Sequence, residues 1–207
     1  MAVSLIKAIV FDLGGVYFED GTAKAMKKFE KILNLQVEKL SEVFGEQGYG
    51  RDYRLGKISE SEFWEAARES LNLDPGMIKR LKEIWHSSYT QNKSMKTLVR
   101  ELRKDYKVAV LSNNIKERVQ YLNKKYNLNK EFDDYVYSFK YGFMKPDSKL
   151  FRILFQKLQV EQDEVVIIDN SAINIETSRR LGFKTILFQS VRQLKRELSN
   201  LLQDEAC

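Results

Sequence analysis

Two of the residue types that restrain a chain covalently or conformationally are scarce in this sequence. Among 207 residues there are one cysteine and two prolines. The cysteine, Cys207, is the last residue, so no disulfide can form within the chain. We therefore expect neither a thiolate metal site nor a cysteine nucleophile, which excludes disulfide-stapled folds and cysteine hydrolases.

Long apolar runs are also missing. The longest, around residues 8–11 and 165–168, fall far short of the roughly 20 residues that a membrane helix needs. The N-terminus lacks the pattern of a cleaved signal peptide. We expect a cytoplasmic protein that does not bind a membrane.

The composition is that of an ordinary globular chain with a basic balance. Apolar residues make up 43% of the sequence, which is enough for a packed core, and the net charge is +6. A positive charge favours anionic partners, either nucleic acid or phosphorylated metabolites, without choosing between them. Lysines and glutamates are interspersed in segments such as 24–33 and 99–107, a pattern typical of solvated helix faces.

Short apolar runs alternate with helical patterns along most of the chain. We predict buried strands at residues 7–11, 108–111, 165–168 and 185–188. The 3.6-residue periodicity predicts helices at residues 95–104, 116–126, 149–158, 173–181 and 191–202. This alternation predicts an α/β fold with a doubly wound, mostly parallel sheet, covered by helices on both faces. Such sheets bind ligands at the carboxyl ends of their strands.

One long segment breaks the alternation, because it contains helical patterns and no convincing strand. The helices are predicted at residues 23–33, 37–44, 61–71 and 76–87. Ser59 and Glu62 have the spacing of a capping box, and Pro75 suits the first turn of a helix. We therefore predict a core domain of residues 1–18 and 92–207, with a helical cap domain of residues 19–91 inserted after the first strand.

Polar residues follow the first two predicted strands of the core. Asp12 precedes Gly14 and Gly15, and it is either a turn residue or a nucleophile that forms an aspartyl phosphate. The two glycines lack Cβ atoms and let backbone amides approach a phosphate closely. Ser112 and Asn113 follow the second strand, where they either cap the next helix or bind a phosphate at its N-terminus.

Two further charged residues stand at the ends of core segments. Lys145 sits among apolar neighbours before Pro146, where its cation could lie beside a carboxylate and a phosphate, although most lysines are simply exposed. Asp169 ends the strand at residues 165–168 and is followed by Asn174 one helical turn later. Two carboxylates, Asp12 and Asp169, at neighbouring strand ends would suit Mg²⁺.

In this order the segments resemble the four motifs of the haloacid dehalogenase superfamily. They are Asp-Leu-Gly-Gly-Val at 12–16, Leu-Ser-Asn at 111–113, Lys-Pro-Asp at 145–147, and Ile-Asp-Asn-Ser at 168–171 with Asn174. The resemblance covers nearly the whole chain and implies a Rossmann-like core. The helical insertion is similar to the small cap of the superfamily's first class. Within the superfamily, the sequence is most similar to sugar-phosphate phosphatases of the glucose-1-phosphatase type.

The resemblance implies a role for each motif residue. Asp12 would be the nucleophile and a ligand of Mg²⁺, and Lys145 would be catalytic by steadying the charge of the transferring phosphoryl group. Asp169 and the main-chain oxygen of Gly14 would complete the metal site. The substrate phosphate would contact five residues: Gly14, Gly15, Ser112, Asn113 and Lys145.

The sequence departs from the family pattern at two positions. Gly14 stands where most phosphatases of the family have an aspartate that acts as general acid and base, and that help contributes about 10²–10⁴-fold. Asn170 stands where an acidic residue is commoner, which would weaken Mg²⁺ binding. Glu19, Asp20 and Tyr17 are candidates for the missing acid, although loop residues of this kind are more often solvated.

The resulting hypothesis is a Mg²⁺-dependent phosphomonoesterase that acts on a small phosphorylated metabolite, with a sugar phosphate favoured. One alternative is an inactive relative that binds a phosphorylated ligand or a protein, and another is a 2-haloacid dehalogenase, which uses no metal. We expect a monomer or homodimer and no nucleic acid partner. Four cap residues are expected to line the substrate pocket, and the only histidine, His86, is expected to be structural. The four are Arg51, Tyr53, Arg54 and Trp64.

Overall fold

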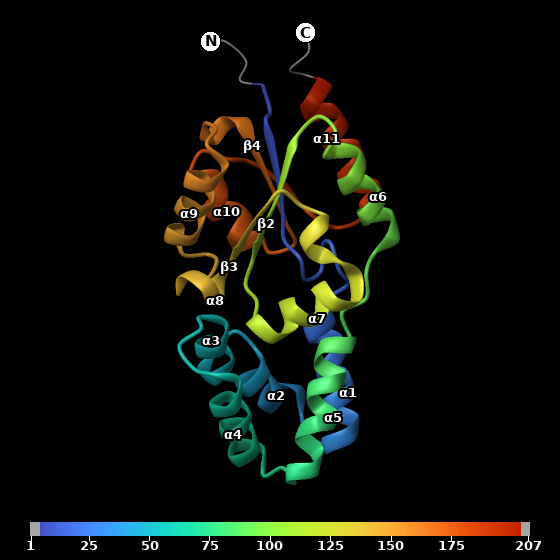
Figure 1. Ribbon diagram of the computed structural model, residues 1–207, viewed down its shortest axis with the longest axis vertical. Coiled ribbons are helices and arrows are strands. Elements are labelled where there is room, and N and C mark those ends of the chain that lie inside the picture. Colours follow the sequence, from blue (N-terminus) through green and yellow to red (C-terminus); the bar gives the residue numbers. More distant parts are fainter. Residues whose placement is uncertain (1–4, 204–207) are drawn as a thin grey trace.

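The computed structural model describes residues 5–203, so Cys207 lies outside the described part. The chain forms one sheet flanked by helices, and a second group of helices lies beyond one end of the sheet (Figure 1). The strands are β1 (Ala8–Phe11), β2 (Lys107–Ser112), β3 (Asp134–Tyr137), β4 (Val165–Asp169) and β5 (Lys184–Leu187). The core helices are α6 (Lys93–Leu102), α7 (Lys116–Tyr126), α8 (Ser138–Tyr141), α9 (Ser148–Leu158), α10 (Ala172–Arg180) and α11 (Val191–Gln203).

The sheet is parallel throughout, with the strand order β3-β2-β1-β4-β5. β1 is central because it pairs with β2 on one side and β4 on the other. This confirms the predicted α/β fold with a doubly wound parallel sheet. The order reverses beside β1, so the carboxyl ends of β1, β2 and β4 meet where such sheets bind ligands.

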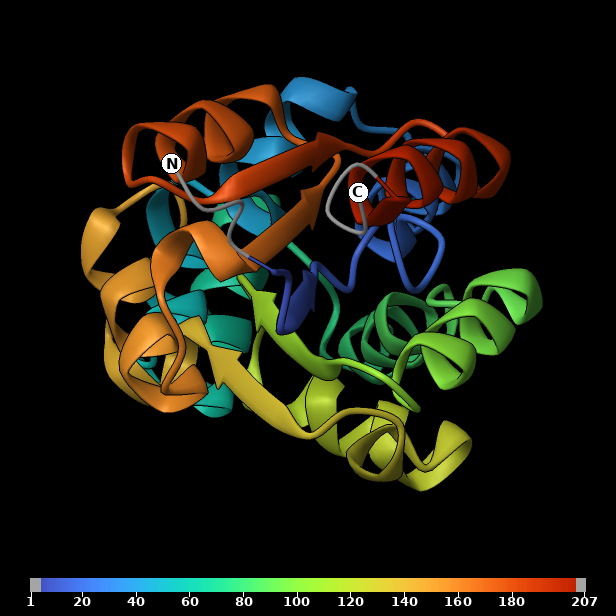
Figure 2. The same ribbon diagram turned by 90° about the horizontal axis from the view of Figure 1, so that it is seen from above.

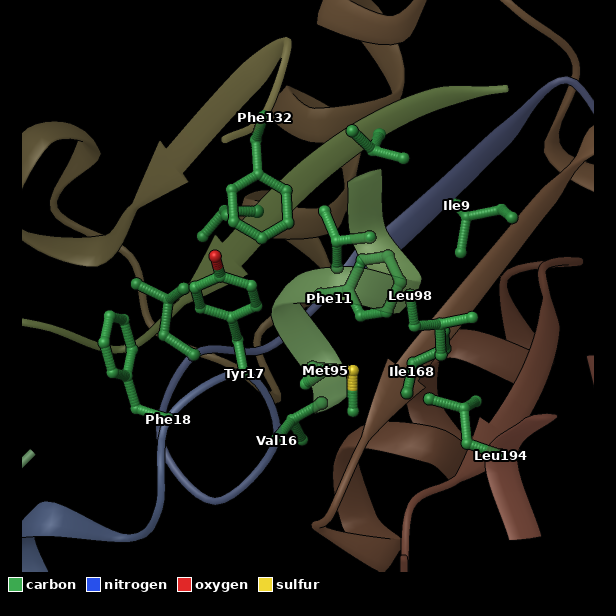
Figure 3. Packing of buried hydrophobic residues seen from close by; sticks show 14 of the residues in the cluster. Ile9, Phe11, Val16, Tyr17, Phe18, Met95, Leu98, Phe132, Ile168 and Leu194 are labelled. Atoms are coloured by element: carbon green, nitrogen blue, oxygen red, sulfur yellow. The ribbon is translucent and has the colours of Figure 1, made fainter. Parts of the chain in front are cut away.

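Helices cover both faces of the sheet (Figure 2). Side chains of β1, β2, β3 and β4 alternate between two buried cores, one on each face. Ile9 and Phe11 of β1 face the core under α6, α7 and α11, together with Met95 and Leu98 (Figure 3). Ala8 and Val10 face the opposite core, which α9 covers. Burial on both faces explains why the strands read as continuous apolar runs.

The chain between β1 and α6 is helical and packs around its own apolar core. Phe44, Phe63 and Trp85 are fully buried at its centre, with ring centroids 5.2–5.9 Å apart. The predicted capping box is confirmed, because the Ser59 hydroxyl accepts from Glu62 N at 3.2 Å and the Glu62 carboxylate accepts from Ser59 N at 2.7 Å. The helices are α1 (Gly21–Leu33), α2 (Val37–Phe44), α3 (Gly48–Arg54), α4 (Glu60–Leu71) and α5 (Pro75–Ser87). The division into two domains at residues 18/19 and 91/92 remains a prediction.

Three elements were not predicted from the sequence. β3 is a short edge strand whose first two residues are only partly buried, so it gives no apolar run. α3 contains Gly48 and Gly50, which have poor helix propensity. α8 is a single turn. None of the described helices is both long enough and apolar enough to span a membrane.

Candidate active site

Three strands bring the first, second and fourth motifs together. Phe11 of β1 pairs with Val110 of β2 and Ile168 of β4. The next residue, Asp12, is tied to β4 by a hydrogen bond from its N–H to the Ile168 carbonyl at 3.0 Å. Asp169 is the last residue of β4 and therefore stands beside Asp12. The register of the sheet thus places both carboxylates at one edge.

Lys145, from the loop between α8 and α9, bridges the two carboxylates. Its Nζ lies 2.9 Å from Asp12 Oδ1 and 2.6 Å from Asp169 Oδ2. The side chains of Lys145 and Asp169 are each 2% exposed, whereas that of Asp12 is 12% exposed. Asp12 is therefore the carboxylate of this triad that a ligand can reach most easily.

Burial and mutual charge decide the protonation of the triad. The pKa of Asp12 is raised to about 6, because the effect of burial, with a smaller contribution from the charge of Asp169, outweighs the opposing effect of Lys145. Burial alone would lower the pKa of Lys145, but the two carboxylates outweigh that effect and raise it. Lys145 is therefore a fixed positive charge, and burial is the main reason why the Asp12 carboxylate is less acidic than an exposed one.

Asp169 is held by protein donors on both carboxylate oxygens. Oδ2 accepts from Lys145 Nζ and, at 3.1 Å, from Asn174 Nδ2. Oδ1 accepts from Ser171 N at 2.8 Å and from Asn174 Nδ2 at 3.1 Å. Asn174 thus orients Asp169, as its spacing in the sequence predicts. A carboxylate has about four acceptor positions, so Asp169 has little capacity left for a metal.

Asn113 fixes the loop that carries Lys145. Its Oδ1 accepts from Lys145 N at 2.8 Å, and its Nδ2 donates to the Lys145 carbonyl at 3.0 Å and to the Glu46 carboxylate at 3.1 Å. α7 begins only after Ile115, which provides no side-chain cap. The interpretation of Ser112 and Asn113 as helix caps is therefore wrong: Ser112 ends β2, and its buried side chain lines the cavity described below.

The glycines after Asp12 serve two different needs. Gly15 has φ +82°, in the left-handed region that favours glycine, and a Cβ there would lie 2.4 Å from Asn170 Nδ2. Gly14 has no positive φ, and a Cβ at this position would make only ordinary contacts, the nearest at 3.6 Å from Tyr89 Cε1. A Cβ at Gly14 would thus fit in ordinary van der Waals contact with the Tyr89 ring.

A cavity of about 370 Å³ lies over the triad, between the sheet edge and the helical segment. Asp12, Gly14, Ser112, Asn113, Lys145 and Asp169 all line it, so the structure brings together six of the seven predicted site residues. Gly15 does not line this cavity but lies against Asn170, which does.

Several residues of the helical segment complete the cavity. Asp20, Thr22, Glu46 and Tyr89 line it, and so does Arg54. Arg54 is buried, and its guanidinium donates to the carbonyls of Phe44, Gly45 and Gly50 at 2.6–3.0 Å. Of these residues, only Arg54 and Asp20 were candidates from the sequence, because Glu46, Thr22 and Tyr89 belong to no recognisable motif.

The remaining candidates lie elsewhere. Tyr53 and Trp64 are buried in the core of the helical segment, and Arg51 is exposed on α3 away from the cavity. Glu19 is exposed and paired with Lys24. Tyr17 is buried in the sheet core, where burial raises its pKa. None of these five residues lines the cavity.

A parallel α/β sheet with an Asp–Lys–Asp cluster under a helical cover defines a class of enzymes that act at a strand-end carboxylate. The model of the family described as haloacid dehalogenase-like hydrolase matches residues 9–188. The chain therefore belongs to this family of hydrolases, and the family predicted from the motifs is confirmed.

Individual relatives span nearly the whole chain. The D-ribitol-5-phosphate phosphatase of Bacteroides thetaiotaomicron is 25% identical over 205 residues, which are 96% of this chain and 99% of that protein. The (S)-2-haloacid dehalogenase 4A of Burkholderia cepacia is 22% identical over 194 residues, 89% of this chain and 83% of that protein. A haloacid dehalogenase family enzyme of B. thetaiotaomicron, solved in complex with magnesium and inorganic phosphate, shares the fold with a TM-score of 0.75. It is 23% identical and covers 90% of this chain and 96% of that one.

Proposed function

We propose that the protein is a Mg²⁺-dependent phosphomonoesterase that transfers the phosphoryl group of a small metabolite to Asp12 and then to water. The observation that carries this proposal is the position of Asp12. Its carboxylate is the most exposed of the triad, it faces the cavity, and Lys145 holds it at 2.9 Å. A carboxylate fixed in this way is a nucleophile in a defined direction.

The charge of the triad supports a divalent cation. Two carboxylates and one ammonium group leave one negative charge, which would repel a phosphate dianion. The described residues contain no cluster of three or more histidine, cysteine, aspartate or glutamate side chains that could hold a metal. Mg²⁺, however, takes one or two carboxylates together with water and substrate phosphate. Asp12 and Gly14 both line the cavity, so the Asp12 carboxylate and the Gly14 main-chain oxygen would hold it, and Asp169 would join them by giving up a 3.1 Å contact from Asn174.

Asp12 and Lys145 have different roles in the proposed reaction. Asp12 forms a bond to phosphorus as the ester oxygen leaves, and a water molecule then attacks the same phosphorus and releases Asp12. Lys145 stays charged throughout and stabilises the extra negative charge of the phosphoryl group beside Asp12. Ser112 lines the cavity at the next strand end and would donate to a phosphate oxygen. The ion, when bound, offsets the negative charge that nucleophile and phosphate bring together.

The cavity restricts the substrate to small molecules. Its volume of about 370 Å³ lies near the lower end of the range for small-molecule sites, roughly 300–1,000 Å³. Polar residues of the helical segment, including Asp20, Thr22 and Glu46, line the same cavity as the triad. Carboxylates and hydroxyls suit the hydroxyl groups of a sugar or sugar alcohol. The phosphatase relative named for D-ribitol 5-phosphate is consistent with this choice.

The test is a hydrolysis assay on a panel of sugar phosphates, sugar alcohol phosphates, nucleotides and p-nitrophenyl phosphate, with Mg²⁺ or with EDTA. We expect release of phosphate that requires the metal and is lost in Asp12→Asn. Asp163→Asn makes the same change at an exposed site and should leave activity unchanged. A single turnover in ¹⁸O-labelled water should place the label in phosphate and none in Asp12.

A metal-independent dehalogenase is the second candidate, and the hydrogen bonding of Asp169 favours it. Both oxygens of that carboxylate accept from the protein donors Lys145, Ser171 and Asn174, and a 2-haloacid dehalogenase is among the relatives. Such an enzyme would release chloride from 2-chloropropionate in the presence of EDTA. The intermediate would be an ester between Asp12 and the substrate. Water would attack the side-chain carboxyl carbon of Asp12, so the ¹⁸O label would enter Asp12. No turnover of any ester or haloacid by the folded protein would leave the phospho-ligand-binding alternative.

A further inference from the structure

The alcohol part of a phosphate monoester leaves as a bare alkoxide only over a high energy barrier. A proton donor therefore has to face the leaving oxygen. Besides the triad, three titratable side chains with donor or acceptor oxygens line the cavity: Asp20, Glu46 and Tyr89. Asp20 already accepts from Ala23 N at 2.9 Å as the cap of α1. Glu46 is exposed and accepts from Asn113. Tyr89 is the one of the three whose oxygen normally carries a proton.

We propose that the Tyr89 hydroxyl is the general acid and base of this site, in the position that Gly14 leaves open. A Cβ on Gly14 would lie 3.6 Å from Tyr89 Cε1 and 3.8 Å from the phenolic oxygen. The phenol therefore lies beside the residue two positions after the nucleophile and lines the same cavity as Asp12. This inference rests on the proposed phosphatase function.

The neighbours of the ring hold the hydroxyl in this place. The phenolic oxygen lies 2.7 Å from Thr22 Oγ1, in a hydrogen bond that either group can donate. Gly21 is required for the ring to fit, since a Cβ there would lie 2.0 Å from Tyr89 Cδ2. Tyr126 fixes the backbone of Tyr89, because its hydroxyl donates to the Tyr89 carbonyl at 3.2 Å.

Arg118 supports the ring from within the protein and acts as a positioning residue. It is fully buried, and none of its three guanidinium nitrogens has a hydrogen-bond partner among the described residues. Its Cζ instead lies 4.5 Å from the centroid of the Tyr89 ring and 4.4 Å from that of Trp85. A charge without an anionic partner is expensive to bury. Its contact with the Tyr89 ring is a cation–π interaction that fixes the ring.

The proton balance of the two steps is simple. As the Asp12 oxygen bonds to phosphorus and the phosphorus–ester oxygen bond breaks, the leaving oxygen takes the proton of Tyr89, which becomes a phenolate. A water molecule then gives its proton to the phenolate as its oxygen bonds to phosphorus and the bond from phosphorus to Asp12 breaks. Phosphate leaves, and Asp12 and Tyr89 are restored. The positive charge of Arg118 attracts the transient negative charge on the ring.

The experiment compares Tyr89→Phe with the wild type on two esters, p-nitrophenyl phosphate and the best alkyl phosphate of the panel. The nitrophenolate leaves without a proton, whereas the alkoxide needs one. We therefore expect the rate of the first step, measured as release of the leaving alcohol in a single turnover, to fall about 10²-fold or more on the alkyl ester and to change less than about threefold on the aryl ester. Tyr49→Phe removes a phenolic hydroxyl from an exposed side chain outside the cavity, and it should change neither rate.

Rescue and competing outcomes complete the test. Adding Gly14→Asp to Tyr89→Phe should restore much of the alkyl-ester rate, because the space beside Gly14 accepts a Cβ. Equal losses of this first-step rate on both esters, or none, would overturn the role of Tyr89. A loss selective for the alkyl ester in Asp20→Asn would assign the acid to Asp20 instead. If the wild type hydrolyses neither ester, the proposed function itself fails, an outcome distinct from normal aryl-ester turnover with an unaffected Tyr89→Phe.

Discussion

Lys145 and Asp169 form an ion pair at 2.6 Å in which both side chains are 2% exposed. The pair is buried in the protein. Asp12 Oδ1 lies 2.9 Å from the same Lys145 Nζ and is therefore the second anion on this ammonium group. The stability of a buried charge depends on its partners, so removing one member of the cluster leaves the others uncompensated. The cluster should therefore stabilise the fold in addition to its role in the proposed reaction.

Lys145→Met should destabilise the fold by about 3–5 kcal/mol, because it leaves two buried carboxylates with no cation. It should also abolish hydrolysis. Urea unfolding measures the first effect, and Lys149→Met, an exposed lysine at the start of α9, is the matched control. Adding Asp169→Asn to Lys145→Met should recover stability without recovering activity. Wild-type stability in Lys145→Met would show that the cluster contributes little to the fold.

The relative positions of residues could be predicted where the residues are close in sequence or where the sheet fixes them. Asp12, Ser112 and Asp169 each end a buried apolar run, and parallel strands bring their carboxyl ends to one edge, so their proximity follows from the pattern alone. Asn174 lies in the first turn of α10, the helix that follows Asp169, and its side-chain amide donates to the Asp169 carboxylate. The predicted helices of the cap agree with α1, α2, α4 and α5 to within two residues at each end.

The unpredictable part depends on how two distant segments meet. Tyr89 follows α5, whereas Gly14 follows β1, and no periodicity links them. Glu46 reaches Asn113 across the cavity from the loop after α2. Tyr53 and Trp64 were expected in the pocket as aromatic residues, but their helices turn them into the apolar core of the cap. Which face of a short amphipathic helix meets the sheet is decided by packing that a single sequence does not reveal.

Asn170→Asp should tighten Mg²⁺ binding. Asn170 lines the cavity and lies against Gly15, next to the proposed ligands, so a carboxylate there adds an anionic oxygen at the site. Groups of this kind change metal affinity about 10–100-fold. We expect the Mg²⁺ concentration for half-maximal hydrolysis to fall about tenfold. Asn129→Asp adds the same charge at a remote exposed position and should not shift it. An unchanged requirement in Asn170→Asp would place the metal away from this side of the cavity.

Gly15→Ala and Gly14→Ala should differ in stability although they are neighbours. A Cβ at Gly15 is strained by its φ of +82° and would lie 2.4 Å from Asn170 Nδ2, so we expect a loss of about 1–2 kcal/mol. A Cβ at Gly14 would meet nothing closer than 3.6 Å. Urea unfolding of the two variants measures the difference. Equal stabilities would mean that the turn after Asp12 relaxes without cost.

His86 should titrate far below the usual range and make the protein less stable in mild acid. Burial, together with the nearby charges of Arg118 and Lys82, lowers its pKa to about 4. Its ring is stacked on Trp85 and Tyr121. An unfolded chain binds this proton near pH 6.5, so between about pH 6.5 and 4 the unfolded state holds more protons than the folded state. The contribution of His86 to stability is therefore complete above pH 6.5 and is lost as the pH falls through about 4.

The measurement is direct because the chain has a single histidine. An NMR titration of the imidazole C–H signal should give a pKa of about 4 for the folded protein. Lys82→Gln should raise this pKa, since it removes one of the charges that oppose protonation. The stability of His86→Phe, which keeps a ring in the stack, should fall less steeply than that of the wild type between pH 6.5 and 4.5. Over this pH range the free energy of unfolding of the wild type should fall by on the order of 2 kcal/mol more than that of His86→Phe. A pKa near 6.5 in the folded protein would mean that the imidazole is hydrated, and the two unfolding curves would then run parallel.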